Sequence, residues 1–80
     1  MIVCAYVRLR DQGPPAYRAT PAEMLAPMVA RLLVPTDYEP DREQWEFEPG
    51  SIVRIEKRLM GGEEVHVAVR RATAPGGTRS

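Results

Sequence analysis

The fold is decided by residues 51–71, which read SIVRIEKRLMGGEEVHVAVRR. Apolar and polar side chains alternate on both sides of Met60-Gly61-Gly62, and this period of two is typical of strands with one buried face. The two glycines supply the positive φ angles that a tight turn between antiparallel strands needs. The sequence therefore predicts a β-hairpin over residues 52–71. Its inward-facing residues are expected to be Val53, Ile55, Leu59, Val65, Val67 and Val69, with Ala68 facing outward.

A second alternating stretch lies at Ile2–Arg10. It predicts a strand with one apolar face, and Asp11-Gln12-Gly13-Pro14-Pro15 predicts a turn after it. The residues of the apolar face are Val3, Ala5, Val7 and Leu9.

Residues 16–35 admit two interpretations. In the first, Thr20 caps a helix that begins at Pro21, but Pro27 would interrupt that helix at a cost of about 3 kcal/mol. In the second, strands over 16–24 and 28–34 pair across a bend at residues 25–27, and Pro21 favours an edge position for the first of them. The second interpretation is favoured for residues 28–34. A helical turn and an irregular strand both stay open for residues 20–26.

Length and composition indicate one small globular domain. The chain has 80 residues, 44% hydrophobic and 28% charged, and no apolar run approaches the ~20 residues of a membrane span. We expect a single domain over residues 1–72 and a flexible tail over 73–80. The single cysteine, Cys4, allows no internal disulfide, and no signal-peptide pattern opens the sequence, so a cytoplasmic location is expected. Cys4 lies in an apolar run and is predicted to be buried.

The charges sum to zero but are unevenly distributed. Residues 35–50 carry six acidic residues against Arg42, together with three prolines and three of the five aromatic residues. A segment of this kind is expected to wrap the fold, with Trp45 and Phe47 packed down and the carboxylates exposed to a basic protein partner. The predicted partner-binding residues are Asp37, Tyr38, Glu39, Asp41, Glu43 and Trp45.

The same acidic residues could form a calcium-binding site, because five of them fall at the ligand positions of a calcium-binding loop. These residues are Asp37, Glu39, Asp41, Glu43 and Glu48. Arg42 stands where that loop needs glycine for its turn, and Pro40 lies beside it, so a solvated or partner-binding segment is favoured. His66 is the single histidine, and the sequence carries no phosphate-binding loop. We therefore expect no catalytic, metal or cofactor site, and no enzyme activity.

Arginines cluster near strands that should be neighbours in the fold, with Tyr6 among them. Such a face could bind single-stranded nucleic acid through charge and base stacking, or its arginines could pair with Glu56 and Glu64 across strands. A pI of 6.6 weighs against a dedicated nucleic-acid binder. The residues of this alternative face are Tyr6, Arg8, Arg10, Arg54, Arg58 and Arg70.

The stretch Phe47-Glu48-Pro49-Gly50-Ser51-Ile52-Val53-Arg54 resembles the Pro-Gly turn and following apolar strand of SH3-like small barrels. With Asp37-Tyr38-Glu39-Pro40 and Glu43-Gln44-Trp45 before it, the block resembles short uncharacterised bacterial proteins and implies no catalytic residues. The sequence thus predicts a mainly β fold, either an SH3-like barrel or a strongly bent antiparallel sheet of four to five strands, with a short helix near 20–27 left open. The favoured function is binding of a protein partner, or self-association, through the acidic segment or an open sheet edge. The alternative is a nucleic-acid-binding barrel, and no membrane association is expected.

Overall fold

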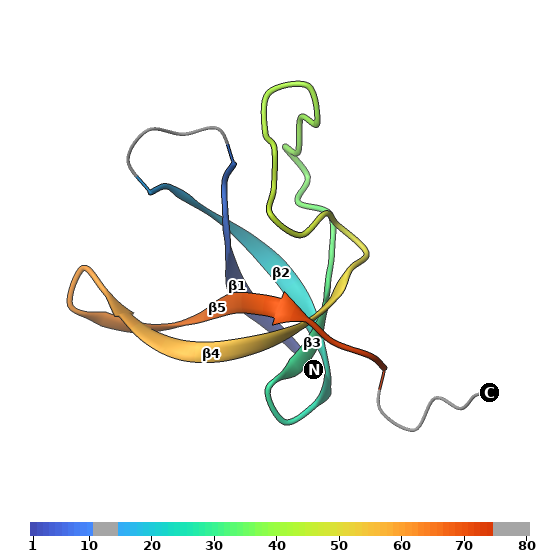
Figure 1. Ribbon diagram of the computed structural model, residues 1–80, viewed down its shortest axis with the longest axis vertical. Helices are drawn as coiled ribbons and strands as arrows, with labels where there is room; N and C mark the ends of the chain where they lie inside the picture. Colours follow the sequence, from blue (N-terminus) through green and yellow to red (C-terminus); the bar gives the residue numbers. More distant parts are fainter. Residues whose placement is uncertain (11–14, 75–80) are drawn as a thin grey trace.

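A computed structural model of the chain describes residues 1–10 and 15–74. Each strand pairs antiparallel with the next, and the last strand returns to pair in parallel with the first, so the sheet closes into a small barrel (Figure 1). The predicted all-β fold is confirmed, and the barrel is consistent with an SH3-like architecture. The strands are β1 (Ile2–Arg8), β2 (Tyr17–Ala26), β3 (Val29–Leu32), β4 (Ile52–Met60) and β5 (Glu63–Arg71).

The described residues contain no helix, so the helical alternative for residues 20–27 is wrong. Residues 17–26 and 29–32 form paired strands, and the turn between them falls at Pro27 and Met28, slightly later than predicted. Proline suits the first central position of a type II turn, and Met28 takes the positive φ of 62° that the second position requires. The described residues therefore include no helix that could cross a membrane.

Pro21 lies inside β2, between β1 and β3, and not at an edge as predicted. Its carbonyl accepts a 2.9 Å hydrogen bond from the Leu33 backbone N–H, but proline has no N–H to return to the Leu33 carbonyl. The hydroxyl of Thr20 donates to that carbonyl at 2.8 Å. Thr20, only 1% exposed, thus satisfies the acceptor that Pro21 leaves open and allows proline in a central strand.

The core lies inside the barrel and is closed at one end by the segment between β3 and β4. The predicted inner face of β1 is confirmed, since Ala5 and Val7 are fully buried and Val3 and Leu9 pack against the same cluster. The buried members of the cluster are Ala5, Val7, Ala22, Ala30, Leu32, Trp45, Phe47, Val53, Ile55 and Ala68.

The β4–β5 hairpin contains a bulge that the alternating pattern did not reveal. Arg54 lies opposite Arg70 whereas Ile55 lies opposite Ala68, so β5 carries one extra residue, Val69. An extra residue reverses the facing of the strand beyond it, and Ala68 is therefore a core residue, 3% exposed, where the sequence predicted an outward position. The hairpin runs on past the barrel (Figure 1), which leaves Leu59 78% exposed although its inward position was predicted.

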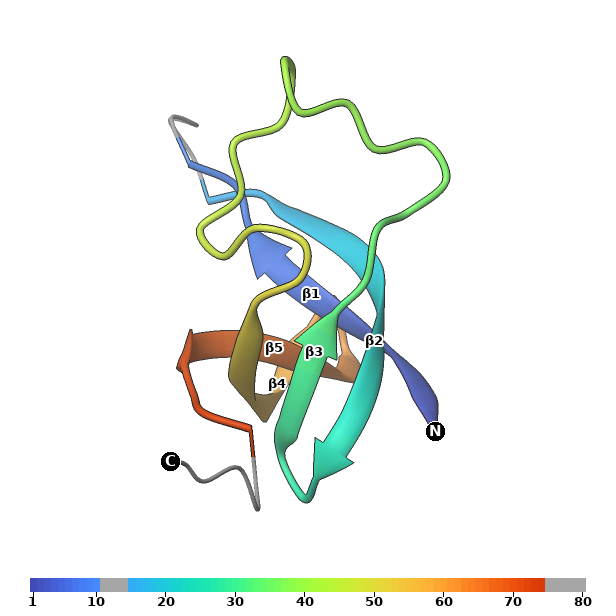
Figure 2. The same cartoon turned by 90° about the vertical axis from the view of Figure 1, so that its right-hand side faces the viewer.

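Residues 33–51 leave β3 and arch past the end of the barrel before returning to β4 (Figure 2). The returning chain lies along the end of β1, where the Glu46 N–H donates to the Arg8 carbonyl at 2.9 Å. The predicted Pro49-Gly50 turn is confirmed, because Gly50 has a φ of 93° and its N–H donates to the Leu32 carbonyl at 2.7 Å. The predicted turn at residues 11–14 and most of the predicted tail, residues 75–80, lie outside the described residues.

Candidate functional site

The acidic loop, residues 35–50, is tied to the barrel by a partly buried ion-pair system in which the side chains of Arg18, Glu43 and Asp37 are 26%, 17% and 74% exposed. Arg18 projects from β2 and contacts the carboxylates of Asp37 and Glu43. Its Nε lies 3.1 Å from Glu43, which also accepts a 3.1 Å hydrogen bond from the indole Nε1 of Trp45. Two of the carboxylates predicted to meet a partner are thus engaged within the domain.

The predicted aromatic anchors of the loop pack as expected. Trp45 is 5% exposed and Phe47 is 7% exposed, so both belong to the core. Tyr38 packs edge-on against Trp45, with ring centroids 5.1 Å apart and an interplanar angle of 69°. Trp45, one of the predicted partner-binding residues, therefore contributes mainly to folding, while the half-buried Tyr38 keeps part of its ring accessible.

The remaining carboxylates of the loop face solvent. Glu39 pairs with Arg42 at 3.3 Å, whereas Asp41, Glu46 and Glu48 form no ion pair with any described residue. Among residues 1–10 and 15–74, no three side chains of metal-ligating type are grouped closely enough to hold an ion. Three of the five carboxylates at the calcium-loop spacing form ion pairs with arginines, namely Asp37, Glu39 and Glu43.

A second surface is formed by the outward side chains of β4, β5 and β1, which we call the basic outer face. Since Ile55 and Ala68 face the core, the neighbouring pair of Glu56 and Val67 lies on the opposite side of the sheet, where Val67 is nevertheless buried, at 7% exposure. Tyr6 lies beside Val67 across the parallel β1–β5 pairing, so one row of side chains crosses all three strands. The charged and aromatic members of the face are Tyr6, Arg8, Arg54, Glu56, Arg58, Arg70 and, at the hairpin end opposite Met60, Glu63.

Positive charge dominates the basic outer face. Arg54 and Arg70 lie directly opposite each other, an arrangement of like charges that destabilises a sheet unless something offsets it. Glu56 supplies the offset: a 2.8 Å hydrogen bond from Arg58 lowers the pKa of Glu56, desolvation opposes the shift, and the charges of Arg58, Arg54 and Arg70 each lower it by a smaller amount. One carboxylate thus serves three arginines.

Five of the six residues predicted for a nucleic-acid face are thereby brought together. Arg8 joins them because it stands two positions along β1 from Tyr6, on the same side of the strand. Arg8, Arg54 and Arg70 have no ion-pair partner among the described residues. Arg10 does not belong to the group, because it lines a polar cavity of about 240 Å³ beside the acidic loop, together with Arg71 and Glu46.

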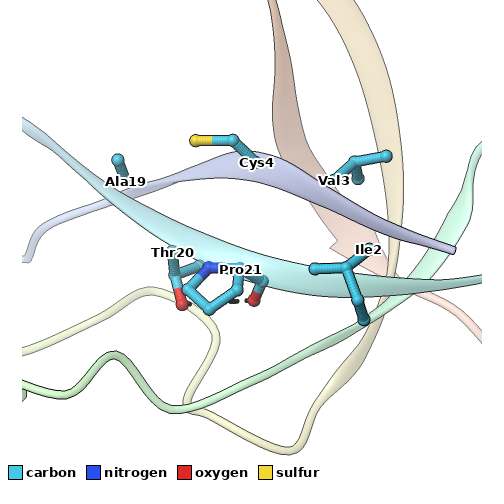
Figure 3. A pocket seen from close by; sticks show the side chains of 6 residues that line it. All are labelled: Ile2, Val3, Cys4, Ala19, Thr20 and Pro21. Carbon is cyan, nitrogen blue, oxygen red and sulfur yellow. Dashed lines mark hydrogen bonds between the residues drawn. The ribbon is translucent and has the colours of Figure 1, made fainter.

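An apolar groove of about 440 Å³ continues the basic outer face over β1 and β2 (Figure 3). It was not predicted. Cys4 lines the groove and is exposed, so the prediction of a buried thiol is wrong: Cys4 shares the outward side of β1 with Tyr6. The lining residues are Ile2, Val3, Cys4, Ala19, Thr20 and Pro21.

Tyr17 is a further member of this surface that the sequence reasoning missed. It lies opposite Arg8 in the β1–β2 register and is 39% exposed. The residue numbers of every pair in that register add to 25, whereas a hairpin centred on the predicted turn at residues 11–15 would give 26. Pairing the two stretches about that turn would have placed Tyr17 opposite Leu9, one residue away from its observed partner Arg8.

No family model, no curated protein and no solved structure matches the chain. The assignment of the fold therefore rests on the strand order and register, and the assignment of a site rests on the side chains that the barrel brings together.

Proposed function

We propose that the domain is a non-catalytic module that binds single-stranded nucleic acid on its basic outer face. The observation that carries the proposal is that four arginines and Tyr6 share one face with only two carboxylates, Glu56 and Glu63. This arrangement meets the condition that separates nucleic-acid binding from internal pairing, namely arginines that share one face in excess of acids. The cytoplasmic location that we propose is one in which RNA is accessible.

The dimensions of the face suit a flexible strand. Neighbouring strands of a sheet lie about 4.8 Å apart, so β4, β5 and β1 place Glu56 and Tyr6 about 10 Å from each other. Arg54 and Arg58 stand four positions apart on β4, about 13 Å along the strand. Guanidinium groups at this spacing can contact different phosphates of one strand, and Tyr6 offers an aromatic ring on which a base can stack.

The acidic loop gives weaker support to the protein-binding alternative. Arg18 already engages Asp37 and Glu43, and Trp45 is buried, so three of the six residues proposed for that role act within the domain. An interface gains most from side chains that are accessible before binding and desolvated on binding.

A direct binding measurement tests the proposal. Fluorescence anisotropy of a labelled single strand of about 15 nucleotides, as RNA and as DNA, should report saturable binding at low salt, where electrostatic attraction is strongest. The double variant Arg54→Gln/Arg70→Gln should bind much more weakly. The matched control is Arg42→Gln, which removes one exposed arginine of the acidic loop and should bind like the wild type. Absence of binding at low salt would refute the proposal.

A second candidate, protein binding at a sheet edge, is favoured by one observation. β3 pairs with β4 only as far as Arg54, and the last hydrogen bond on that side runs from the Ile55 N–H to the Met28 carbonyl. Because backbone groups alternate in direction along a strand, those of Lys57 and Leu59 face the same unpaired side. An extended peptide could add a strand there.

The variant Leu59→Pro tests this second candidate, because it removes one edge N–H without touching the pairing with β5. A protein captured by the wild type and by Arg54→Gln, but lost with Leu59→Pro, would support edge binding. Equal capture by the wild type and both variants would refute it.

A further inference from the structure

We infer that the apolar groove on β1 and β2 receives the unpaired bases of the strand whose phosphates lie on the basic outer face. The inference rests on the proposed function and specifies how the ligand is oriented. Phosphates lie toward β4 and β5, bases lie toward β2, and Tyr6 stands at the boundary between the two halves.

The groove and the basic outer face form one continuous surface. Tyr6 pairs with Val67 on β5 and with Ala19 on β2, so its ring borders both halves. Two residues before Tyr6 on β1, Cys4 lies opposite Pro21, and both line the groove (Figure 3). A strand held by arginines on one side of Tyr6 therefore has an apolar surface directly on the other side.

The positive charge beside the groove favours a nucleic acid over an apolar peptide as its ligand. A purely apolar peptide would leave the arginines of the adjoining face without partners, whereas a nucleic acid carries one anionic group for each flat, weakly polar ring. The groove, of about 440 Å³, is shallow and open to solvent, so it offers a contact surface and not an enclosed pocket. Charge on one side and apolar surface on the other match a single strand that lies across the barrel.

The chemistry of the groove predicts little discrimination among bases. Its one hydroxyl, that of Thr20, is 1% exposed and already donates to the Leu33 carbonyl. The remaining lining side chains are apolar apart from the Cys4 thiol, which is a weak hydrogen-bond donor. Bases would therefore be held by their faces and not read by their edges, and a duplex, whose base faces are stacked on each other, should bind poorly.

Cys4 provides a direct readout, since it is the one cysteine of the chain and lies in the groove. Its rate of alkylation by a maleimide is measured with and without a saturating oligothymidine of about 15 nucleotides, a mixed-sequence single strand and the matching duplex. Both single strands should slow the reaction about tenfold or more and bind with similar affinity, and the duplex should protect less. The control is Cys4→Ser/Val34→Cys, whose thiol replaces a side chain that is 61% exposed and lies outside the groove.

A second variant tests the groove without chemical modification. Ala19→Leu fills the groove from an exposed position and should weaken single-strand binding by about fivefold or more if one base is displaced from its stacked position. Its circular dichroism spectrum and urea midpoint should match those of the wild type, because the new side chain projects outward.

The outcomes separate the inference from the proposed function. Binding with full protection of Cys4 supports both. Binding with Cys4 alkylated at its unliganded rate overturns the groove assignment and leaves the basic outer face as the site. Absence of binding at low salt overturns both. Protection that grows with protein concentration and needs no oligonucleotide would show that a second copy of the chain covers the groove, which also overturns the inference.

Discussion

The salt dependence of single-strand binding should follow the charge of the basic outer face. Four arginines and two glutamates leave two net positive charges there: Arg8, Arg54, Arg58 and Arg70 against Glu56 and Glu63. For single strands, log K falls with log salt by about 0.7 for each phosphate neutralised, so the wild-type slope should be about −1.4. Raising the salt from about 50 mM to about 200 mM should then weaken binding about sevenfold.

Two substitutions shift this slope in opposite directions. Arg70→Gln removes one charge and should reduce the slope to about −0.7, so that the same change in salt weakens binding only about threefold. Glu56→Gln releases the arginines from their shared carboxylate and should steepen the slope to about −2.1 while tightening binding at low salt.

The assay is an anisotropy titration at four salt concentrations, with Arg42→Gln as the control of equal charge change outside the face. Circular dichroism and urea unfolding of each variant establish that the fold is retained. The reasoning is refuted if Arg70→Gln and the wild type share one slope, or if Glu56→Gln weakens binding at low salt. It is also refuted if Arg42→Gln lowers the slope as much as Arg70→Gln does.

Three further predictions concern the stability of the barrel. Thr20→Val should lower the free energy of unfolding in urea by about 1–3 kcal/mol, because the buried carbonyl of Leu33 loses its donor, whereas Thr36→Val at an exposed site should change it little. Gly50→Ala should cost about 1–2 kcal/mol in the same assay through its φ of 93° alone, since no atom lies within 4 Å of the added methyl group; an unchanged midpoint would contradict this. The lowered pKa of Glu56 means that its stabilising contribution is present above its ordinary pKa of 4.5 and is lost as the pH falls through the lower folded-state pKa, so Glu56→Gln should lose less stability on acidification than the wild type.

The two alternating stretches were sufficient to predict most of the sheet. Periodicity identifies a strand whenever one face is buried and the other solvated, and this condition holds for Ile2–Arg8 and for most of β4 and β5. The pattern failed at Ala68, because a single extra residue in β5 reverses the facing of the strand without changing its composition. The edge position predicted for Pro21 was also wrong. The Thr20 hydroxyl replaces the missing N–H by donating to the Leu33 carbonyl, and that carbonyl comes within reach only when the chain of β3 lies alongside β2.

The sequence identified most residues of the candidate site, but it could not establish which of them lie next to each other. Five of the six members of the arginine group come together, because Tyr6, Arg8, Arg54 and Arg58 all occupy positions that face outward wherever the neighbouring positions face the core. Arg10 departs from the group because it lies beyond the end of β1, where the acidic loop returns. The acidic residues were identified, but their internal partner Arg18 is distant in sequence and gave no local signal.

By itself, the sequence determined a small β domain, the β4–β5 hairpin, and an acidic loop anchored by Trp45 and Phe47, since each depends on periodicity, turn chemistry or hydrophobic burial over a few residues. Only the tertiary structure decided that β5 closes onto β1, and with it which charges are neighbours. Closure joins strands that are some sixty residues apart in the chain, and local patterns carry no register over that separation. The pairing of β1 with β5 at Ala5–His66 and Tyr6–Val67 brings the residues of the basic outer face together and places that face beside the apolar groove of β1 and β2.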